Sequence, residues 1–574
     1  MIGGVAKTLP RNADVAEQLE LLADILELEG EAAFRVLAYR RAAARVRETS
    51  GLVAELALEG RAKDLPGIGK TIEEKIVQIV DDGEIHALTR HKANVPQDVV
   101  EFTRLPGLGP KTARKIWQEL GITTLVDLRE AAAGERLRGL AGVGPRLEQR
   151  IQTALADGVA AAPGEKRPLL GHGLPVVQAV VSVLREHPAA VEVSEAGSVR
   201  RRKETFRDLD IIATATDPGA LTDYFTKLRW VEQVVAKGES KATVVSNEGF
   251  RFDLRVVPPE SFGNLLQHFT GSKHHNVALR EAAVKRGLSV SEYGVQTVET
   301  GELFRTGSEA ELYEFLGYEF IPPELRENLG ELEAARKGGL PALVELGDLR
   351  GDLHAHTTWS ADAKNTVEEM ALAARQRGYS YLAITDHSHY LREGRLEAHD
   401  REIDGVNARL KPFRLLKGIE VNIRADGSLD VDDEALAGRD WVLASLHTAF
   451  DRSPTERVLE AMENPHVDCI GHLTARKLNK RGPADVDVGR VIAKALETGT
   501  FLEINSQPDR LDLRDVHARA AGEAGLKLAI STDAHSASAL SFAELGVGQA
   551  RRGWLAKEQV LNTRTWPQLK RLLP

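Results

Sequence analysis

Apolar residues along this 574-residue chain change their spacing several times, and each change marks a different kind of structure. Up to about residue 160 they recur at helical spacing, broken by short glycine-containing turns, which predicts an all-helical region. A linker, AAPGEKRP, follows at 161–168, and strand-like runs such as DLDIIATAT and FRFDLRVV lie within 170–260. A mixed segment then continues to about residue 345.

From Gly351 onward, short hydrophobic strands alternate with helical stretches, a pattern typical of parallel βα units. In order, the strands are DLHAH, YLAITDH, LLKGIEVNI, WVLASLH, VDCIGH, TFLEINS and LKLAISTDAH. Seven such strands predict a barrel-like α/β fold. Because one hydrophobic core does not extend over 574 residues, we expect a multidomain protein.

The composition narrows the class of protein. The chain is 42% hydrophobic and 28% charged, as globular proteins are, and no apolar run approaches the ~20 residues of a membrane helix. Its first residues lack an apolar signal core, and the single cysteine, Cys469, excludes an internal disulfide. These features predict a cytoplasmic protein with no membrane partner, in which Cys469 is a buried, inert thiol.

The charge of the chain does not decide whether it binds nucleic acid. A net charge of −10 argues mildly against such binding, because backbone phosphates require Lys and Arg. However, the basic stretches FRVLAYRRAAARVR and SVRRRK lie in the first half, and many of the acids lie in the second. Since carboxylates of a metal site would add negative charge, the question stays open.

A short motif occurs three times in the helical region: LPGIGK at 65–70, LPGLGP at 105–110 and AGVGPR at 141–146. Each copy precedes an amphipathic helix, and the motif resembles the helix-hairpin-helix. Glycines there let backbone amides approach a DNA phosphate without reading sequence. The glycines concerned are Gly67, Gly69, Gly107, Gly109, Gly142 and Gly144. One such turn would fit an ordinary helix-loop-helix, but three copies favour contact with the DNA backbone.

Two carboxylates in the strand-rich region are candidates for metal binding. Asp208 and Asp210 are two apart on a predicted strand, so their side chains project from the same face. Asp253, in RFDLRVV, faces opposite to its apolar neighbours. Three carboxylates on adjacent strands can hold two divalent cations about 3.5–4 Å apart, an arrangement used for nucleotidyl transfer. Taken alone, Asp-Leu-Asp could equally end an edge strand.

The surroundings of these aspartates resemble the nucleotidyltransferase pattern of family X DNA polymerases. Gly197-Ser198 and Arg200-Arg201 precede the Asp pair, HFTGSKHHNVALR follows at 268–280, and SEYGV at 291–295 resembles the end of the thumb. The resemblance implies that Asp208, Asp210 and Asp253 bind Mg²⁺ or Mn²⁺ as the catalytic ligands, and that the nucleotide-binding residues are Ser198, Arg201, Phe269, Gly271, Asn276 and Arg280. Ser198 and Arg201 would contact the triphosphate, Phe269 and Gly271 the sugar, Asn276 the base or minor groove, and Arg280 the template.

Two positions depart from the family pattern. His268 stands where a Tyr is common, which puts sugar discrimination in doubt. Arg207 takes the place of a Gly before the first Asp, where a bulky cation could perturb the metal or triphosphate geometry.

The first glycine motif, LPGIGKTIEEKIVQIV, also resembles the lyase domain of the same family. The resemblance places Lys75 at the Schiff-base position and Tyr39 at a phosphate-binding position. An amine attacks an aldehyde only when it is partly neutral, so it needs desolvation or neighbouring cations. Glu73 and Glu74 lie beside Lys75, and Thr71 replaces a supporting lysine. A lysine on an amphipathic helix is more often a solvated surface residue, so both interpretations stay open.

Imidazoles and carboxylates end nearly every strand of the C-terminal half. They are His354, His356, Asp362, His387, Glu420, His447, His472, Asp533 and His535. Because the carboxyl ends of strands in a parallel α/β barrel converge on the active site, these nine side chains should meet. A single His at a strand end is usually a satisfied polar group, but nine in one topological position predict a metal centre. Asp386, beside His387, either orients that ligand or caps a helix.

The order of these residues resembles the polymerase and histidinol phosphatase (PHP) family. The resemblance implies up to three ions, Zn²⁺ or Mn²⁺, in a hydrolytic phosphoesterase site. The implied ligand sets are His354, His356, Glu420 and Asp533 for the first ion, Glu420, His447 and His472 for the second, and Asp362, His387 and His535 for the third. WSADAKNT has one residue more than the form common in polymerase-linked members, which puts Asp362 in doubt.

Together the two resemblances imply a DNA gap-filling repair polymerase with a PHP 3′–5′ exonuclease, and we expect it to act as a monomer on gapped or nicked duplex DNA and deoxynucleoside triphosphates. The expected domains are a lyase-like helical domain at 1–92, a fingers-like helical domain at 93–160, an α+β palm at 161–257, a thumb at 258–340 and a distorted (β/α)7 PHP barrel at 341–574. Two alternatives remain: a nuclease with an inactive polymerase scaffold that binds DNA, and a small-molecule phosphoesterase.

Overall fold

The computed structural model describes residues 9–10, 12–49, 51–92, 94–103, 105, 108–140, 143–156 and 167–573. Contacts between residues divide the chain into two compact units, Met1–Lys166 and Arg167–Pro574. The division falls within the linker predicted at 161–168. None of the helices in the described ranges is both long and apolar enough to cross a membrane.

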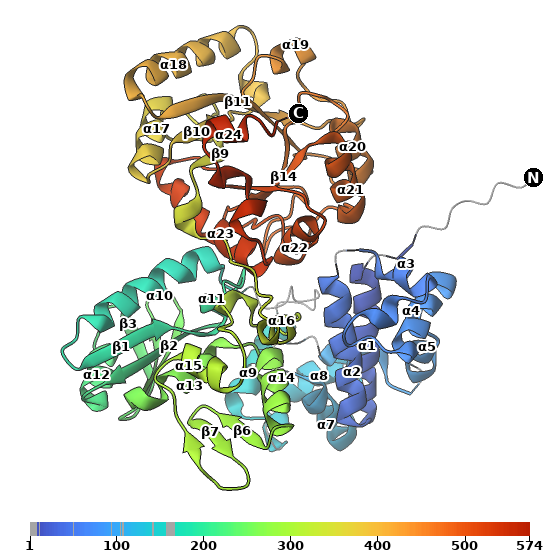
Figure 1. The fold of residues 1–574 in the computed structure, drawn as a ribbon. Coiled ribbons are helices and arrows are strands. Elements are labelled where there is room, and N and C mark those ends of the chain that lie inside the picture. The colour runs from blue at the N-terminus through green and yellow to red at the C-terminus, as the bar shows by residue number, and fades with distance from the viewer. Residues whose placement is uncertain are drawn as a thin grey trace, which may run out of the picture. The chain divides into compact units, whose positions relative to one another are not determined.

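The N-terminal unit is helical wherever it is described, as the spacing of apolar residues predicted (Figure 1). Its helices are α1 (Asn12–Glu29), α2 (Ala33–Glu48), α3 (Val53–Leu58), α4 (Lys70–Asp82), α5 (His86–Lys92), α6 (Gln97–Phe102), α7 (Pro110–Leu120), α8 (Leu125–Ala133) and α9 (Pro145–Ala156), with 3₁₀ turns η1 (Ala62–Asp64) and η2 (Leu137–Gly139). Helix α7 shows how the sequence sets these limits. Pro110 occupies its first turn, and Gly121 ends it at φ +66°, a conformation that favours glycine.

The second unit begins with a mixed five-stranded sheet and its helices. The elements are α10 (Leu170–Arg185), β1 (Ala190–Glu195), α11 (Gly197–Arg200), β2 (Asp208–Ala215), α12 (Pro218–Thr226), β3 (Val231–Lys237), β4 (Lys241–Ser246) and β5 (Arg251–Val257). The strand order is β1-β2-β5-β4-β3, in which only β2 and β5 pair in parallel. Leu209, Ile211, Phe252 and Leu254 are fully buried, so the residues between them on β2 and β5 face the other side of the sheet.

A smaller α+β segment follows the five-stranded sheet. Its elements are α13 (Phe262–Thr270), α14 (Lys273–Val284), β6 (Leu288–Ser291), β7 (Gly294–Thr297), β8 (Leu303–Phe304), α15 (Glu309–Phe315) and α16 (Glu331–Arg336), with 3₁₀ turns η3 (Pro259–Ser261) and η4 (Pro323–Leu325). The three strands form one antiparallel sheet. A capping box between Ser308 and Glu311 starts α15.

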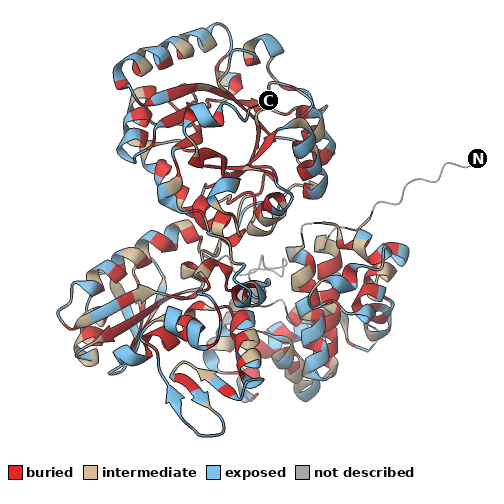
Figure 2. Ribbon diagram, viewed as in Figure 1, coloured by how far each residue is buried: buried red, intermediate tan, exposed pale blue. Residues whose placement is uncertain are grey.

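The last part of the chain is a parallel barrel, and all seven predicted strands are present in it. They are β9 (Gly351–Ala355), β10 (Tyr381–Ile384), β11 (Arg414–Asn422), β12 (Trp441–Ser445), β13 (Cys469–Gly471), β14 (Phe501–Asn505) and β15 (Leu528–Ser531), and they pair in chain order. A parallel bridge between Ala355 and Ala534 brings the first and last strands together. The strands are almost entirely buried, whereas the surrounding helices expose their outer faces (Figure 2).

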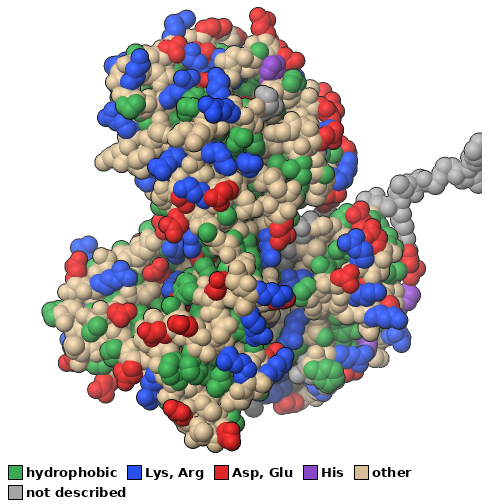
Figure 3. Space-filling view, in the orientation of Figure 1, with side chains coloured by type: hydrophobic (Ala, Val, Ile, Leu, Met, Phe, Trp, Pro, Cys, Tyr) green, Lys and Arg blue, Asp and Glu red, His purple; other side chains and the backbone are tan. Residues whose placement is uncertain are grey.

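Helices cover the outside of the barrel. They are α17 (Val367–Gln376), α18 (Arg395–Leu410), α19 (Asp433–Leu436), α20 (Pro454–Ala461), α21 (Val488–Thr498), α22 (Asp515–Glu523) and α23 (Ala543–Arg552). Helix α24 (Trp566–Leu569) packs against one end of the barrel, and the 3₁₀ turns are η5 (Leu346–Asp348), η6 (Ser388–Tyr390), η7 (Ala537–Phe542), η8 (Lys557–Gln559) and η9 (Leu561–Thr563). On the visible face of the barrel, Lys and Arg side chains mix with Asp and Glu, and no large hydrophobic patch interrupts them (Figure 3).

The barrel interior is apolar at one end and polar at the other. Leu416 on β11, Trp441 and Leu443 on β12, and Phe501 on β14 pack together with Trp566 of α24. Cys469 belongs to the same cluster and is fully buried, as expected for an inert thiol. Because side chains on a strand alternate between faces, residues further along the same strands also face the interior. This register places the candidate ligands at the polar end.

Candidate active sites

The three palm carboxylates lie together, as the sequence predicted. Asp210 on β2 pairs directly with Asp253 on β5, and Asp208 pairs with Arg251. Arg251 Nε lies 3.7 Å from Asp208 Oδ1 and 3.3 Å from Asp253 Oδ2. Thr243 Oγ1 donates a hydrogen bond to Asp253. The parallel pairing of β2 and β5 therefore gathers carboxylates from two strands at one point.

Asp210, the central carboxylate of this group, has a raised pKa. Burial, and then the nearby charges of Asp253 and Asp208, raise the pKa of Asp210 to about 6. A Cβ at position 197 would lie 2.3 Å from Asp210 Oδ2, and Gly197 has φ +65°, so only glycine fits here. A cluster of carboxylates that repel one another in this way suits divalent cations, which would relieve the repulsion. Asp208, Asp210 and Asp253 are thus able to hold them.

Arg201, the expected triphosphate contact, binds two groups of the protein itself. Its Nε lies 2.9 Å from Glu327 Oε1, and its Nη1 donates to the carbonyl oxygen of Thr270 at 2.7 Å. Arg200 instead pairs with Glu309, with Nη2 2.7 Å from Oε2. Ser198 lies in α11, between Gly197 and these two arginines. The four-residue helix α11 is therefore fixed to the following segment by two ion pairs.

The segment HFTGSKHHNVALR forms the junction between α13 and α14. Asn276 is buried, and its Nδ2 donates to the carbonyl oxygens of His268 at 2.7 Å and Gly271 at 3.2 Å. A Cβ on Gly271 would meet Asn276 Oδ1 at 2.3 Å. Phe269 is partly buried, with the Arg255 guanidinium 4.4 Å from its ring centre. The side-chain amide of Asn276 thus holds the backbone between α13 and α14 in place.

Three further residues of this region are Arg280 and the two that depart from the family pattern, Arg207 and His268. Arg280 and Arg207 are both exposed. Among the described residues, Arg207 makes no side-chain hydrogen bond or ion pair, including with the carboxylates that it precedes. His268 is half-buried, and burial lowers the pKa of its imidazole. With both departures from the family pattern present, Asp210 still pairs directly with Asp253.

A pocket of about 210 Å³ in the N-terminal unit contains Lys75 and Tyr39, which the sequence had paired. Arg35, Arg90 and His91 also line it. Burial, followed by the charges of Arg90 and Arg35, lowers the pKa of the Lys75 ammonium. These are the conditions under which an amine becomes a nucleophile.

The acidic neighbours of Lys75 do not enter that pocket. Glu73 is buried on the other side of α4, and its Oε2 accepts the backbone N–H of Lys63 at 2.8 Å. Glu74 and Thr71 are exposed. Glu148, four residues after the last glycine of the third motif, repeats the Glu73 arrangement, because it accepts the N–H of Leu137 at 2.9 Å.

Four of the six motif glycines are described, and Gly107 and Gly142 lie outside the described residues. Gly69 and Gly109 cap the N-termini of α4 and α7. Gly67 has φ +90°, and around Gly67, Gly69, Gly109 and Gly144 an added Cβ would meet nothing within 4 Å. These turns therefore present open backbone, as an approaching phosphate would require.

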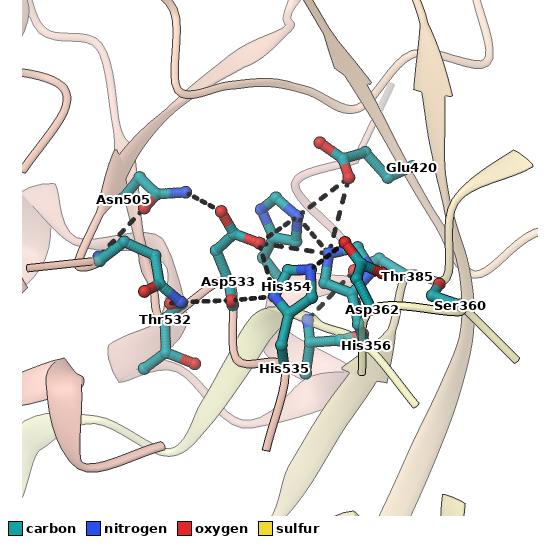
Figure 4. Close-up of polar contacts among 12 residues, drawn as sticks. His354, His356, Ser360, Asp362, Thr385, Glu420, Asn505, Thr532, Asp533 and His535 are labelled. Atoms are coloured by element: carbon teal, nitrogen blue, oxygen red, sulfur yellow. Dashed lines mark hydrogen bonds and ion pairs between the residues drawn. The ribbon is translucent and has the colours of Figure 1, made fainter. Parts of the chain in front are cut away.

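The barrel brings the nine predicted side chains to the carboxyl ends of its strands. Figure 4 shows six of them: His354, His356, Asp362, Glu420, Asp533 and His535. Glu420, at the end of β11, lies at their centre. Its Oε1 is 3.1 Å from His472 Nε2 and 3.3 Å from His447 Nε2, and its Oε2 is 2.8 Å from His387 Nδ1. His354 Nε2 lies 3.5 Å from the Oε2 atom. His356 Nε2 lies 3.6 Å from the same Oε2 atom, so one buried carboxylate faces five imidazoles.

The remaining ligand candidates complete the cluster. Asp533 Oδ1 lies 3.2 Å from His356 Nε2 and 3.5 Å from His354 Nε2. Asp362 Oδ2 lies 3.2 Å from His535 Nε2 and 3.9 Å from His387 Nε2. The backbone is strained at two of these positions, because His472 has φ +27° and Asp533 has φ +50°.

The donor set fits divalent metal ions. The Nε2 atoms of His354 and His356 face each other at 3.1 Å, and Glu420 Oε2, although 2.8 Å from His387 Nδ1, is buried without a well-aligned hydrogen bond among the described residues. Two facing nitrogens and a carboxylate oxygen that lacks an aligned hydrogen bond are groups that a shared cation would join. Three groups bring their ligand atoms within 4.8 Å: His354, His356 and Glu420; His387, Glu420 and His447; and His356, His387 and His535.

Neighbouring polar residues orient the ligands. Glu503 on β14 is fully buried, and its Oε1 lies 2.7 Å from His354 Nδ1. Burial by itself lowers the pKa of His354, but the charges of Glu503, Asp533 and Glu420 outweigh it and hold that pKa well above its usual value. Asn505 Nδ2 donates to Asp533 Oδ2 at 3.1 Å. The sequence analysis missed both residues, although an acid and an amide within the apolar strand FLEIN were a signal.

Asp386 neither caps a helix nor contacts its neighbour His387 through its side chain. It is buried, and its carboxylate accepts hydrogen bonds from Thr357 Oγ1 at 2.6 Å and Ser360 Oγ at 2.7 Å, with His399 Nε2 at 3.1 Å. The helix-cap interpretation was therefore wrong. Asp386 instead fixes the loop between His356 and Asp362.

A known protein resembles this chain over almost its full length. The DNA polymerase/3′-5′ exonuclease PolX of Bacillus subtilis (strain 168) is 38% identical over 571 residues, which are 98% of this chain and 99% of that protein. This chain belongs to the PolX family.

Matches to parts of the chain agree with this PolX assignment. A helix-hairpin-helix domain model matches 10–85, a SAM-like helix-hairpin-helix tandem model 99–157, a DNA polymerase beta thumb model 265–327 and a PHP domain model 352–507. DNA polymerase lambda of Rattus norvegicus is 26% identical over 55% of this chain and 56% of its own. A protein named "Probable phosphatase" from Thermoanaerobacter sp. (strain X514) is 32% identical over 37% of this chain and 89% of its own.

Proposed function

We propose that this PolX family member fills gaps in DNA and trims DNA 3′ ends, in two separate active sites. The observation that carries the proposal is the presence in one chain of the palm carboxylates Asp208, Asp210 and Asp253 and, in a different fold, the nine-residue barrel centre. The family relative is named for both activities. We place the domains at 1–92, 93–160, 161–257, 258–340 and 341–574.

In the palm, the three carboxylates would hold Mg²⁺ or Mn²⁺, and such ions activate the primer 3′-hydroxyl and neutralise the leaving pyrophosphate. Ser198 and Arg201 would bind the triphosphate. Because Arg201 now pairs with Glu327, nucleotide binding would exchange that carboxylate for phosphate oxygens. Phe269, Gly271, Asn276 and Arg280 would line the sugar, base and template side. Gapped or nicked duplex DNA and deoxynucleoside triphosphates are the proposed substrates.

In the barrel, the imidazoles and carboxylates would hold up to three Zn²⁺ or Mn²⁺ ions, which activate water for attack on a phosphodiester. Glu503 fixes the Nδ1 side of His354 and so leaves Nε2 directed into the centre. Asn505 does the same for one oxygen of Asp533. The products would be shortened 3′ ends, including ends at abasic or damaged sites in base excision repair. We propose that the protein acts as a cytoplasmic monomer.

The test uses a one-nucleotide-gapped duplex with a 5′-labelled primer and Mn²⁺, with and without deoxynucleotides. Asp208→Ala with Asp210→Ala should abolish primer growth and leave shortening. His354→Ala with His356→Ala should abolish shortening and leave growth. If either pair abolished both activities in a protein that remained folded, the two-site proposal would be wrong. Shortening without growth in the wild type would support a nuclease on an inactive polymerase scaffold, and hydrolysis of a phosphomonoester alone would support a small-molecule phosphoesterase.

A lyase activity is a second candidate, favoured by one observation. Lys75, Tyr39 and two arginines share a pocket, and the pKa of Lys75 is lowered there. A partly neutral amine beside cations that bind phosphate is suited to removing a 5′-deoxyribose phosphate through a Schiff base.

A further inference from the structure

Cations lie beside the proposed metal ligands in the cavity at the top of the barrel. The cavity has a volume of about 450 Å³, and Lys364, Lys477 and Arg510 line it together with the ligands. Lys480 lies next to them, because it shares a partner with Lys477. Lys477, Lys480 and Arg510 form what we call the basic rim. None of the three is needed to hold a metal ion.

The basic rim carries more positive charge than its partners neutralise. Lys477 Nζ and Lys480 Nζ lie 3.4 Å and 3.1 Å from one oxygen, Asp509 Oδ2. Two ammonium groups thus share one carboxylate. Arg510 Nε lies 3.4 Å from Asp533 Oδ2, an oxygen that also accepts a hydrogen bond from Asn505. Burial alone would raise the pKa of Asp509, but Lys480 and Lys477 outweigh it and lower that pKa.

A rigid hairpin holds the two lysines in place. Lys477 N donates to the carbonyl oxygen of Arg481 at 2.9 Å, and Arg481 N donates back at 2.7 Å. Asn479, at the turn, has φ +61° and donates from Nδ2 to the carbonyl oxygen of Arg167 at 2.8 Å. Leu478 N donates to the carbonyl oxygen of Asp509 at 2.6 Å, which ties the hairpin to the Arg510 loop. These hydrogen bonds therefore hold the backbone of both lysines beside the Arg510 loop.

We propose that the basic rim binds the backbone phosphates of a single DNA strand whose 3′ end enters the metal centre. This inference rests on the proposed nuclease function and adds the residues that would hold its DNA strand. Hydrolysis takes place at one phosphate group, so the positive charge of the rim that Asp509 and Asp533 leave unneutralised is matched only when further phosphates follow. A phosphomonoester offers none, whereas each nucleotide of a strand adds one negative charge. The rim thus selects a polynucleotide over a small phosphate ester.

The test compares two substrates for the same metal centre: a 5′-labelled single-stranded oligonucleotide and p-nitrophenyl phosphate, both with Mn²⁺ and no deoxynucleotides. Lys477→Gln with Lys480→Gln should raise the KM for the oligonucleotide and leave p-nitrophenyl phosphate hydrolysis unchanged. The slope of log(kcat/KM) against log[salt] should become shallower by about 0.7 for each lost phosphate contact. Asp509→Asn should act in the opposite sense and lower the KM, because it removes the carboxylate that competes with phosphate.

The matched control is Lys557→Gln, which removes a half-exposed lysine of the barrel that pairs with one carboxylate, that of Asp348, at 2.6 Å. It should leave both substrates and the salt slope unchanged. An unaltered oligonucleotide KM and salt slope in the double variant, or an equal loss on both substrates, would overturn the rim proposal. A wild-type protein that cleaves neither substrate would instead contradict the proposed nuclease function, so the two failures are distinguishable.

Discussion

The surroundings of Lys75 decide whether its amine can react with an aldehyde. A lysine on an exposed helical face stays protonated and cannot attack an aldehyde, but burial and the charges of Arg90 and Arg35 lower the pKa of this one. We expect borohydride to trap wild-type protein on DNA with a 5′-deoxyribose phosphate, and Lys75→Ala to lose the adduct while keeping primer extension. Lys70→Ala, an exposed lysine at the start of the same helix, is the control. Trapping of Lys75→Ala at the wild-type level would assign the adduct to another amine.

At the scale of the residue, sequence predicted the ligands better than the groups that orient them. His354, Glu420 and Asp533 are polar residues at the ends of apolar strands, and chain topology alone brings such ends together. Glu503 was missed because its partner His354 is 149 residues away, and only the closed barrel places β9 near β14. The pairing of Arg201 with Glu327 was equally hidden, since 126 residues separate them.

At the scale of the element, helix α23 of the barrel supports the loop that would bind nucleotide. Arg552, at its end, donates from Nη1 to the carbonyl oxygen of Arg201 and to Glu327 Oε1, both at 3.0 Å, and from Nη2 to Asp515 Oδ2 at 2.5 Å. Arg552→Gln would leave Glu327 free to hold Arg201 more tightly. We therefore expect the KM for deoxynucleotide to rise on the order of tenfold, about 1.4 kcal/mol, with a smaller change in kcat, in single-nucleotide incorporation assays.

Arg551→Gln provides the matched comparison for this effect. Arg551 is adjacent on α23 and also bonds across to the thumb segment, with Nε 2.7 Å from Glu324 Oε1, but it does not reach Arg201. Loss of that pair should loosen the same contact surface without changing the nucleotide KM. Equal changes in KM for the two variants would mean that α23 acts on overall stability and has no specific effect on Arg201.

Hydrophobic periodicity predicted most of the helices and strands, but its success differed between the barrel, the palm and the thumb. Each strand of the barrel is a short apolar run bounded by polar residues, so all seven could be recognised, and parallel strands joined by helices pair in chain order. The palm was different, because its order β1-β2-β5-β4-β3 depends on pairing between distant strands. Periodicity also could not predict the three-stranded sheet of the thumb, in which β8 has only two residues.

At the scale of the whole molecule, buried ion pairs tie the palm, thumb and barrel of the 167–574 unit together. Glu309 accepts from Arg200 and Arg326, and Glu327 from Arg201 and Arg552. Burial would raise the pKa of each carboxyl, but these guanidinium groups outweigh it and lower both values from 4.5 to about 2. A lowered pKa means that the ionised carboxylate stabilises the fold above pH 4.5 and that this contribution disappears as the pH falls toward 2.

Acid should therefore unfold this unit by breaking the contacts that join its parts, and each carboxylate should contribute on the order of 3 kcal/mol. Trp117→Phe removes the single tryptophan of the N-terminal unit, so the fluorescence of the other five reports on residues 167–574 alone. We expect the midpoint of urea unfolding to drop steeply below pH 4.5 in this background. Glu309→Gln should unfold more easily at pH 7 and depend less on pH, because it lacks the group that titrates. A midpoint that stayed level down to pH 3 in the Trp117→Phe background would mean that the ion pairs do not hold the unit together, and that apolar packing alone does.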